Sequence, residues 1–147
     1  MSLKTRIAED VKAAMKAGDK ARLSTLRMLS AELKQREVVD AVELTDAVVI
    51  AAIEKMIKQR REAESQYRAA GRAELADKEA QEIACLSAYL PQRLSPAELE
   101  ALIAEGIAAT GAAGVKDMGK LMGWLKPRVA GRADLGELSG RVKARLG

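Results

Sequence analysis

The chain has 147 residues, with 25 Lys and Arg against 21 Asp and Glu and a formal charge of +4 at pH 7. It has no His and one Cys, which excludes Ser-His and Cys-His nucleophile pairs, excludes an internal disulfide and removes the commonest zinc ligand. A chain of this length forms one domain or two small ones. Composition therefore argues against histidine-dependent hydrolases, His-ligated zinc sites and disulfide-stabilised folds.

Targeting features point to a cytoplasmic protein. No apolar run approaches the ~20 residues that a membrane-spanning helix needs. The N-terminal segment is amphipathic and carries Glu9 and Asp10, unlike a secretory signal. A single cysteine suits a reducing compartment. We therefore expect a cytoplasmic location and no membrane partner.

The first 90 residues are expected to be helical, because alanine is abundant, aromatic residues are scarce and strand alternation is weak. One helix covers residues 3–17 and ends at Gly18, and Asp19 caps a second helix to about residue 37. Residues 38–44 are expected to form a loop. Thr45 caps a long helix to about residue 70, and a fourth helix covers 73–89, which predicts an antiparallel hairpin. The residues expected to be buried in this hairpin are Val49, Ile53, Met56, Ile57, Tyr67, Leu75, Ile83, Leu86 and Leu90.

The clearest boundary follows at Pro91, which ends the fourth helix. Ser95 precedes Pro96 and stands three residues before Glu98, which predicts a capping box at the start of a new helix. Three short helices are expected at 96–110, 116 to about 126 and about 134–146, joined by 111–114 and 127–133. The sequence predicts an all-α protein: a helical N-terminal domain with a long hairpin (1–92) and a small three-helix C-terminal module (93–147).

Positive charge is concentrated near the C-terminus, where residues 116–147 hold eight basic and three acidic side chains. In the predicted helix 116–126, an apolar stripe is opposed by Gly119 and Gly123, which share their side with Lys116 and Lys120. Each glycine inside a helix costs about 0.8–1 kcal/mol relative to alanine. Three explanations stay open: the other half of the protein covers this side through a close helix crossing, a polyanion contacts it, or a partner protein binds it.

The polyanion explanation defines a set of candidate RNA-binding residues, in which glycines permit close approach and basic groups neutralise phosphate. The set is Lys116, Gly119, Lys120, Gly123, Lys126, Arg128 and Arg132. Contact with six phosphates would give log K a slope of roughly −4 to −5 against log salt. The final helix carries Arg141, Lys143 and Arg145, which either form a solvated face or extend this surface. The scarcity of aromatic residues favours recognition of duplex shape or backbone over single-strand stacking.

A second basic stripe consists of Lys58, Arg61, Arg68 and Arg72 at helical steps. Acidic residues on the following helix, among them Asp77, Glu79 and Glu82, favour structural ion pairing there.

The chain carries no catalytic constellation. Cys85 lies among apolar neighbours and is expected to be a buried, inert thiol. Residues 111–114 (GAAG) lack the Lys-Ser/Thr ending of a phosphate-binding loop. We therefore predict no catalytic, cofactor-binding or metal-binding residues.

Short segments spread along the whole chain together resemble the YqeY family, whose C-terminal half is similar to the tail domain of the B subunit of glutamine-dependent tRNA amidotransferase (the GatB/YqeY domain). They are LSTLRML at 23–29, KQRRE at 58–62, YLP at 89–91 with LS at 94–95, KDMGK at 116–120 with MG at 122–123, and GRAD at 131–134. One departure is Leu135, where the family often has glycine, so the start of the last helix is expected to differ slightly.

The resemblance implies an all-α, two-part fold and a link to tRNA-dependent amidation, in which the tail domain looks like a tRNA-contacting appendage. It does not imply catalysis, because the ATP-using cradle and the glutaminase partner of the amidotransferase are not in this chain. We expect a tRNA- or structured-RNA-binding accessory protein with no cofactor and no chemistry of its own. The alternatives are a protein-interaction module that docks on an amidotransferase or a synthetase, and a carbon–nitrogen ligase that uses glutamine as amide donor.

Overall fold

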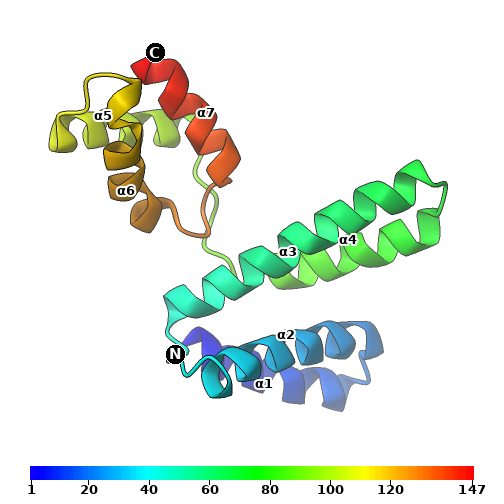
Figure 1. Ribbon diagram of the computed structural model, residues 1–147. Helices are drawn as coiled ribbons and strands as arrows, with labels where there is room; N and C mark the ends of the chain where they lie inside the picture. Colours follow the sequence, from blue (N-terminus) through cyan, green and yellow to red (C-terminus); the bar gives the residue numbers. More distant parts are fainter. The chain divides into compact units, whose positions relative to one another are not determined.

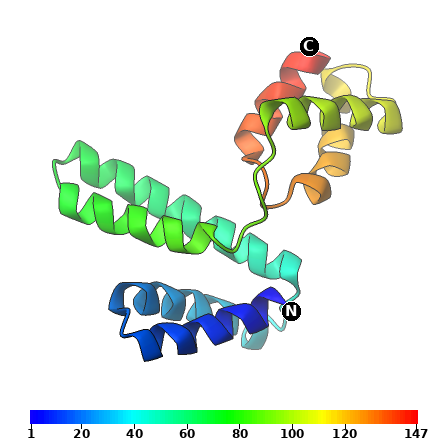
Figure 2. The same cartoon turned by 180° about the vertical axis from the view of Figure 1, so that it is seen from behind.

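The computed structural model describes residues 1–147 and contains helices but no strands, which confirms the all-α prediction (Figures 1 and 2). The elements are α1 (Leu3–Ala17), α2 (Lys20–Val38), α3 (Asp46–Ala69), α4 (Ala73–Ser87), α5 (Pro96–Thr110), the 3₁₀ turn η1 (Val115–Asp117), α6 (Met118–Val129) and α7 (Leu135–Leu146).

The contacts divide the chain into two compact units, an N-terminal unit, Met1–Leu90, and a C-terminal unit, Pro91–Gly147. That residues 1–92 and 93–147 are independent domains stays a prediction.

Local capping chemistry sets where several helices begin. The side chains of Asp19, Thr45, Ser95 and Asp134 each accept a hydrogen bond from a backbone N–H three residues later. At α5 the capping box is present in full, because Glu98 also accepts from the backbone N–H of Ser95. These bonds satisfy N–H groups that have no partner inside a helix. The N-caps predicted at Asp19, Thr45 and Ser95 are therefore confirmed.

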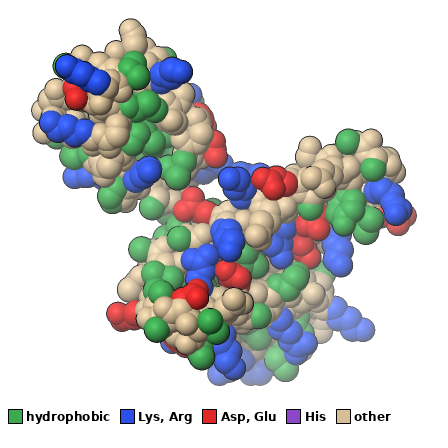
Figure 3. All heavy atoms as spheres, in the orientation of Figure 1, with side chains coloured by type: hydrophobic (Ala, Val, Ile, Leu, Met, Phe, Trp, Pro, Cys, Tyr) green, Lys and Arg blue, Asp and Glu red, His purple; other side chains and the backbone are tan.

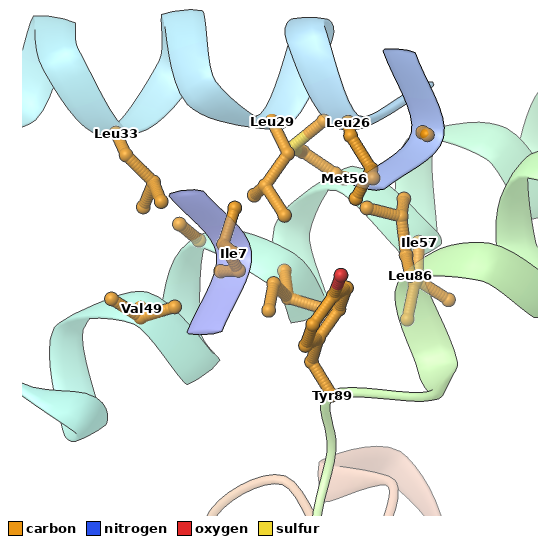
Figure 4. Packing of buried hydrophobic residues seen from close by; sticks show 12 residues of the cluster. Ile7, Leu26, Leu29, Leu33, Val49, Met56, Ile57, Leu86 and Tyr89 are labelled. Atoms are coloured by element: carbon orange, nitrogen blue, oxygen red, sulfur yellow. The ribbon is translucent and has the colours of Figure 1, made fainter. Parts of the chain in front are cut away.

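The core of the N-terminal unit is formed where all four of its helices meet (Figure 4). In both cartoon views α3 and α4 lie side by side and run in opposite directions. The labelled core residues are Ile7 from α1, Leu26, Leu29 and Leu33 from α2, Val49, Met56 and Ile57 from α3, Leu86 from α4 and Tyr89 just after it. Burial of these side chains is the main source of stability in such a helical unit.

Of the residues expected in the hairpin core, Tyr67, Ile83 and Leu90 are only half-buried, and Leu75 is the one that is exposed. It is 39% exposed, whereas Leu86 in the same helix is fully buried. Leu75 lies in the first turn of α4, next to the turn from α3, where the α3–α4 pair extends beyond α1 and α2 (Figure 1). The prediction of a buried Leu75 is wrong because the amphipathic pattern does not show where the covering helices end.

Tyr89 connects the end of the N-terminal unit to α1. Its ring is only 4% exposed, and its hydroxyl donates to Asp10 Oδ2 at 2.6 Å. The guanidinium of Arg6 lies 4.8 Å from the ring centroid, and Arg22 approaches the Asp10 carboxylate at 3.6 Å. Burial, together with the hydrogen bond to Asp10, raises the pKa of Tyr89, so the phenol stays a donor at neutral pH. The chain is therefore anchored directly before Leu90.

In the C-terminal unit, α5 and α6 cross closely at Gly106. A Cβ built on this residue would lie 2.7 Å from Leu121 Cδ1 and 2.8 Å from Trp124 Cε3. Gly106 is buried, and Leu121 is fully buried opposite it. Only glycine lets the two helices approach this closely. The helical spacing of α5 alone does not single out this glycine.

The end of α6 differs from the prediction. Pro127 was expected in the connection after the helix, yet α6 continues through it to Val129. Val129 is fully buried, and the Arg128 side chain donates to the Trp124 carbonyl at 2.6 Å. Burial of Val129 therefore favours the last turn although Pro127 donates no backbone hydrogen bond.

The close crossing at Gly106 predicts that an added Cβ destabilises the protein there but not at a glycine with open space around it. We expect Gly106→Ala to destabilise the protein by about 1–2 kcal/mol, because overpacking of about 1–3 kcal/mol exceeds the gain in helix propensity. Gly140→Ala in α7, where a Cβ meets nothing within 4 Å, is the control and should stabilise it by about 0.5–1 kcal/mol. Urea unfolding followed by circular dichroism measures both, and equal effects would contradict the close crossing.

Candidate nucleic-acid interface

The predicted glycine side of α6 lies opposite the core. Gly119 and Gly123 are both exposed, and a Cβ on either would meet nothing within 4 Å. On the other side of the helix, Leu121 and Leu125 are fully buried. No other element of the C-terminal unit crosses at either glycine, so packing within this unit does not account for them.

Three lysines surround these glycines. Lys116, Lys120 and Lys126 are exposed, and none of them forms an ion pair. The one acidic residue of this stretch, Asp117, accepts a hydrogen bond from the Ala113 N–H at 2.9 Å. We call Lys116, Gly119, Lys120, Gly123 and Lys126 the α6 glycine face. It offers three uncompensated positive charges beside a bare stretch of helix backbone.

Arg128 and Arg132, unlike the three lysines, contact other groups of the C-terminal unit. The Arg128 guanidinium lies 3.7 Å from the centroid of the Trp124 ring. Arg132 Nε donates to the Gln92 carbonyl at 2.8 Å, and the Arg132 carbonyl accepts from the Leu94 N–H. Both arginines therefore have contacts inside the C-terminal unit, which distinguishes them from the other five candidates.

The arginines of α7 form ion pairs with acidic side chains. Arg141 contacts Glu100 and Glu137 at 3.1 Å, and Arg145 contacts Glu100 at 3.2 Å. Their charges are compensated, and they join α7 to α5. That they enlarge the α6 surface stays a prediction; Lys143 alone among the predicted α7 cations forms no ion pair.

The second basic stripe is paired only in part. Arg68 contacts Glu64 and Asp77 at 3.2 Å, as expected for ion pairing across α3 and α4. Lys58, Arg61 and Arg72 are exposed and form no ion pair. The pairing that holds α3 to α4 in the interior is made by Arg60, whose Nε lies 3.1 Å from Glu82 Oε2 with both side chains nearly buried.

Cys85 lines a pocket of about 270 Å³ between α2 and α4, together with Arg22, Lys78 and Glu82. Its side chain is half-buried, so the prediction of a buried thiol is only partly correct. Burial raises the pKa of the Cys85 thiol, which keeps it protonated at neutral pH. The thiol is therefore a poor nucleophile, as the sequence suggested.

The structure shows neither a metal-binding cluster nor a membrane-spanning helix. The structure brings together no group of three or more His, Cys, Asp or Glu side chains able to hold a metal ion. None of its helices has the length and apolar composition needed to traverse a lipid bilayer.

Comparison with known proteins places the chain in a family. It is 35% identical over 81 residues to an uncharacterized protein of Schizosaccharomyces pombe, a match that covers 55% of this chain and 66% of the relative, just under two thirds of its length. It is 26% identical over 130 residues to "Altered inheritance of mitochondria protein 41, mitochondrial" of Pyrenophora tritici-repentis, covering 87% of this chain and 71% of that protein. The model of Yqey-like proteins matches residues 4–146. This chain therefore belongs to the YqeY family.

Proposed function

We propose that this YqeY protein is an RNA-binding accessory protein that contacts tRNA or another structured RNA through the α6 glycine face, with no chemistry of its own. One observation carries the proposal: two glycines inside α6 are exposed, surrounded by open space and flanked by three unpaired lysines. Gly123, inside α6, costs about 0.8–1 kcal/mol of helix stability relative to alanine, which nothing in the C-terminal unit offsets, and Gly119 in the first turn adds a second bare position. A ligand that needs the bare backbone would offset it.

The shape and charge of this face suit the backbone of a folded RNA. Lysines neutralise phosphates, and a helix side without projecting side chains fits the wide, shallow minor groove of A-form RNA. Single-strand stacking has little support, because Tyr89 is buried and the Trp124 ring is half-buried with the Arg128 guanidinium over it. The resemblance to an amidotransferase tail domain favours tRNA over other structured RNAs.

Pro127 also changes the backbone hydrogen bonding on this face. The Gly123 carbonyl would normally accept from the N–H four residues later, but that residue is Pro127, which has none. No side chain donates to this carbonyl. A ribose 2′-hydroxyl is a donor that RNA has and DNA lacks. Recognition of the 2′-hydroxyl by Gly123 is therefore part of the proposal.

The first prediction from the proposed function concerns charge. The triple variant Lys116→Gln, Lys120→Gln, Lys126→Gln should bind bulk tRNA more weakly, and the slope of log K against log salt should shrink by about 2–3 because three phosphate contacts are lost. The control variant Lys58→Gln, Arg61→Gln, Arg72→Gln removes the same charge from the N-terminal unit. Gel shifts over a salt series measure both. Absence of a tRNA shift with the natural chain at low salt would refute the proposal.

The second prediction separates binding from stability. Gly119→Leu with Gly123→Leu should keep or raise the melting temperature, because leucine favours helices and both positions have space, yet it should weaken tRNA binding at least tenfold. Gly140→Leu, an exposed glycine on α7, should leave binding unchanged. Unchanged tRNA binding by the double variant, with loss of a nuclease-resistant amidotransferase partner, would instead support the docking alternative.

The third prediction concerns the kind of nucleic acid. A duplex RNA should bind about fivefold more tightly than its 2′-fluoro counterpart, which keeps A-form geometry but lacks the hydroxyl donor. This fivefold ratio corresponds to about 1 kcal/mol, the contribution of one hydrogen bond. Pro127→Ala supplies an N–H for the Gly123 carbonyl and should reduce this ratio towards one. Fluorescence anisotropy with the two duplexes measures the ratio. An equal affinity of the natural chain for both would show that Gly123 does not recognise the hydroxyl.

A further inference from the structure

The outer side of α2, opposite the N-terminal core, carries a row of three basic residues. Lys20, Arg27 and Lys34 follow one another at seven-residue steps, which are about 10.5 Å each along a helix, so they share one side. All three side chains are exposed. We call these residues the α2 basic row.

No acidic residue compensates this row. The positions between its members on the same side are Ser24 and Ala31, which are uncharged. The acidic residues inside α2 are paired elsewhere, Glu32 with Arg36 and Lys55, and Glu37 with Lys4.

Other basic residues of α2 are paired, which makes the row distinct. Arg22 contacts Asp10 at 3.6 Å and Arg36 contacts Glu32 at 3.3 Å, whereas none of the row residues forms an ion pair. The N-terminal unit is nearly balanced in sequence, with sixteen basic and fifteen acidic residues. Folding therefore leaves unpaired positive charge along this side of α2, in addition to the unpaired Lys58, Arg61 and Arg72.

The row also borders a shallow hollow. Lys20 and Arg27 stand at this hollow, and the small side chains of Ser24 and Ala31 form part of its lining. Basic side chains are visible over α1 and α2 in the space-filling view (Figure 3). A strand of phosphates could lie along such a surface with cations beside it.

We infer that the α2 basic row is a second contact for the RNA backbone, so that the protein holds one RNA through both of its units. The inference rests on the proposed function and adds a second surface to it. Charges repeated along about 21 Å of helix match a polymer with regularly spaced negative charge.

Other partners fit this row less well. An interfacial membrane helix inserts an exposed apolar side, but the large apolar residues Leu26, Leu29 and Leu33 of α2 are buried in the core. A protein interface has an apolar centre, often with aromatic residues, whereas Leu23 and Met28 are the only large apolar side chains lining the hollow beside the row, and neither is aromatic.

Two contacts on one chain would act together. Once one unit has bound, the other meets the same RNA at a high effective concentration, so joint binding exceeds either contact alone by 10²–10⁴-fold where both can engage, as a rough general range. Loss of either surface should therefore reduce affinity strongly without abolishing charge-dependent binding at low salt.

The test uses the full chain and bulk tRNA. The row variant Lys20→Gln, Arg27→Gln, Lys34→Gln should bind at least tenfold more weakly than the natural chain, with a salt slope smaller by about 2–3. The control Lys58→Gln, Arg61→Gln, Arg72→Gln removes the same charge from the same unit and should change affinity less than threefold. Circular dichroism melting checks that both variants are folded.

The outcomes separate this inference from the proposed function. If the natural chain binds no tRNA, both fail. If it binds and the α6 lysine variant loses affinity, but the row variant binds like the control, the proposed function stands and the second contact is refuted. Equal losses in the row variant and the control would show an effect of net charge alone, which also refutes it. Row-dependent binding to phosphatidylserine vesicles with unchanged tRNA binding would identify a membrane contact instead.

Discussion

The orientation of α6 about its own axis is the constraint on which the candidate interface depends. Leu121, Leu125 and Val129 are fully buried, and Gly106 lets α5 come close on the same side. These contacts leave α6 no freedom to turn, because rotation would expose three large apolar side chains at roughly 1.5–3 kcal/mol each. Gly119 and Gly123 are held outward as a consequence. The interface is therefore built by packing on the far side of the helix, and the exposed residues themselves contribute little to holding it.

Ion pairing decides which of the many basic residues are available to a ligand. The sequence presents the arginines of α7 and the lysines of α6 as equivalent members of one basic segment. In the structure Arg141 and Arg145 share Glu100, whereas the α6 lysines have no acidic partner. The same division occurs in α2, where Arg36 is paired and Arg27 is free. Net charge by segment is thus a poor guide to an interface, because a single well-placed glutamate removes two candidates.

Features encoded by neighbouring residues could be predicted from the sequence, and those that depend on distant residues could not. The caps at Asp19, Thr45, Ser95 and Asp134 follow from side chains three residues from their partners, and the glycine side of α6 follows from helical spacing. Exposed Leu75 could not be foreseen, since it depends on how far α1 and α2 extend over α4. Gly106 was missed because nothing in its own helix shows that Trp124 will pack against it. The continuation of α6 past Pro127 was missed because local propensity opposes it and burial of Val129 outweighs that propensity.

The single thiol of the chain has a practical consequence for studying this protein. Cys85 sits at a pocket wall in the N-terminal unit and has no competitor elsewhere, so a fluorophore can be attached at one defined point without removing other cysteines. Because burial raises its pKa, alkylation will be slow at neutral pH and will accelerate in alkaline buffer as the thiolate forms. A dye placed there reports on the helix pair α2 and α4 while leaving α6 chemically untouched, which allows events in the two halves of the molecule to be followed separately.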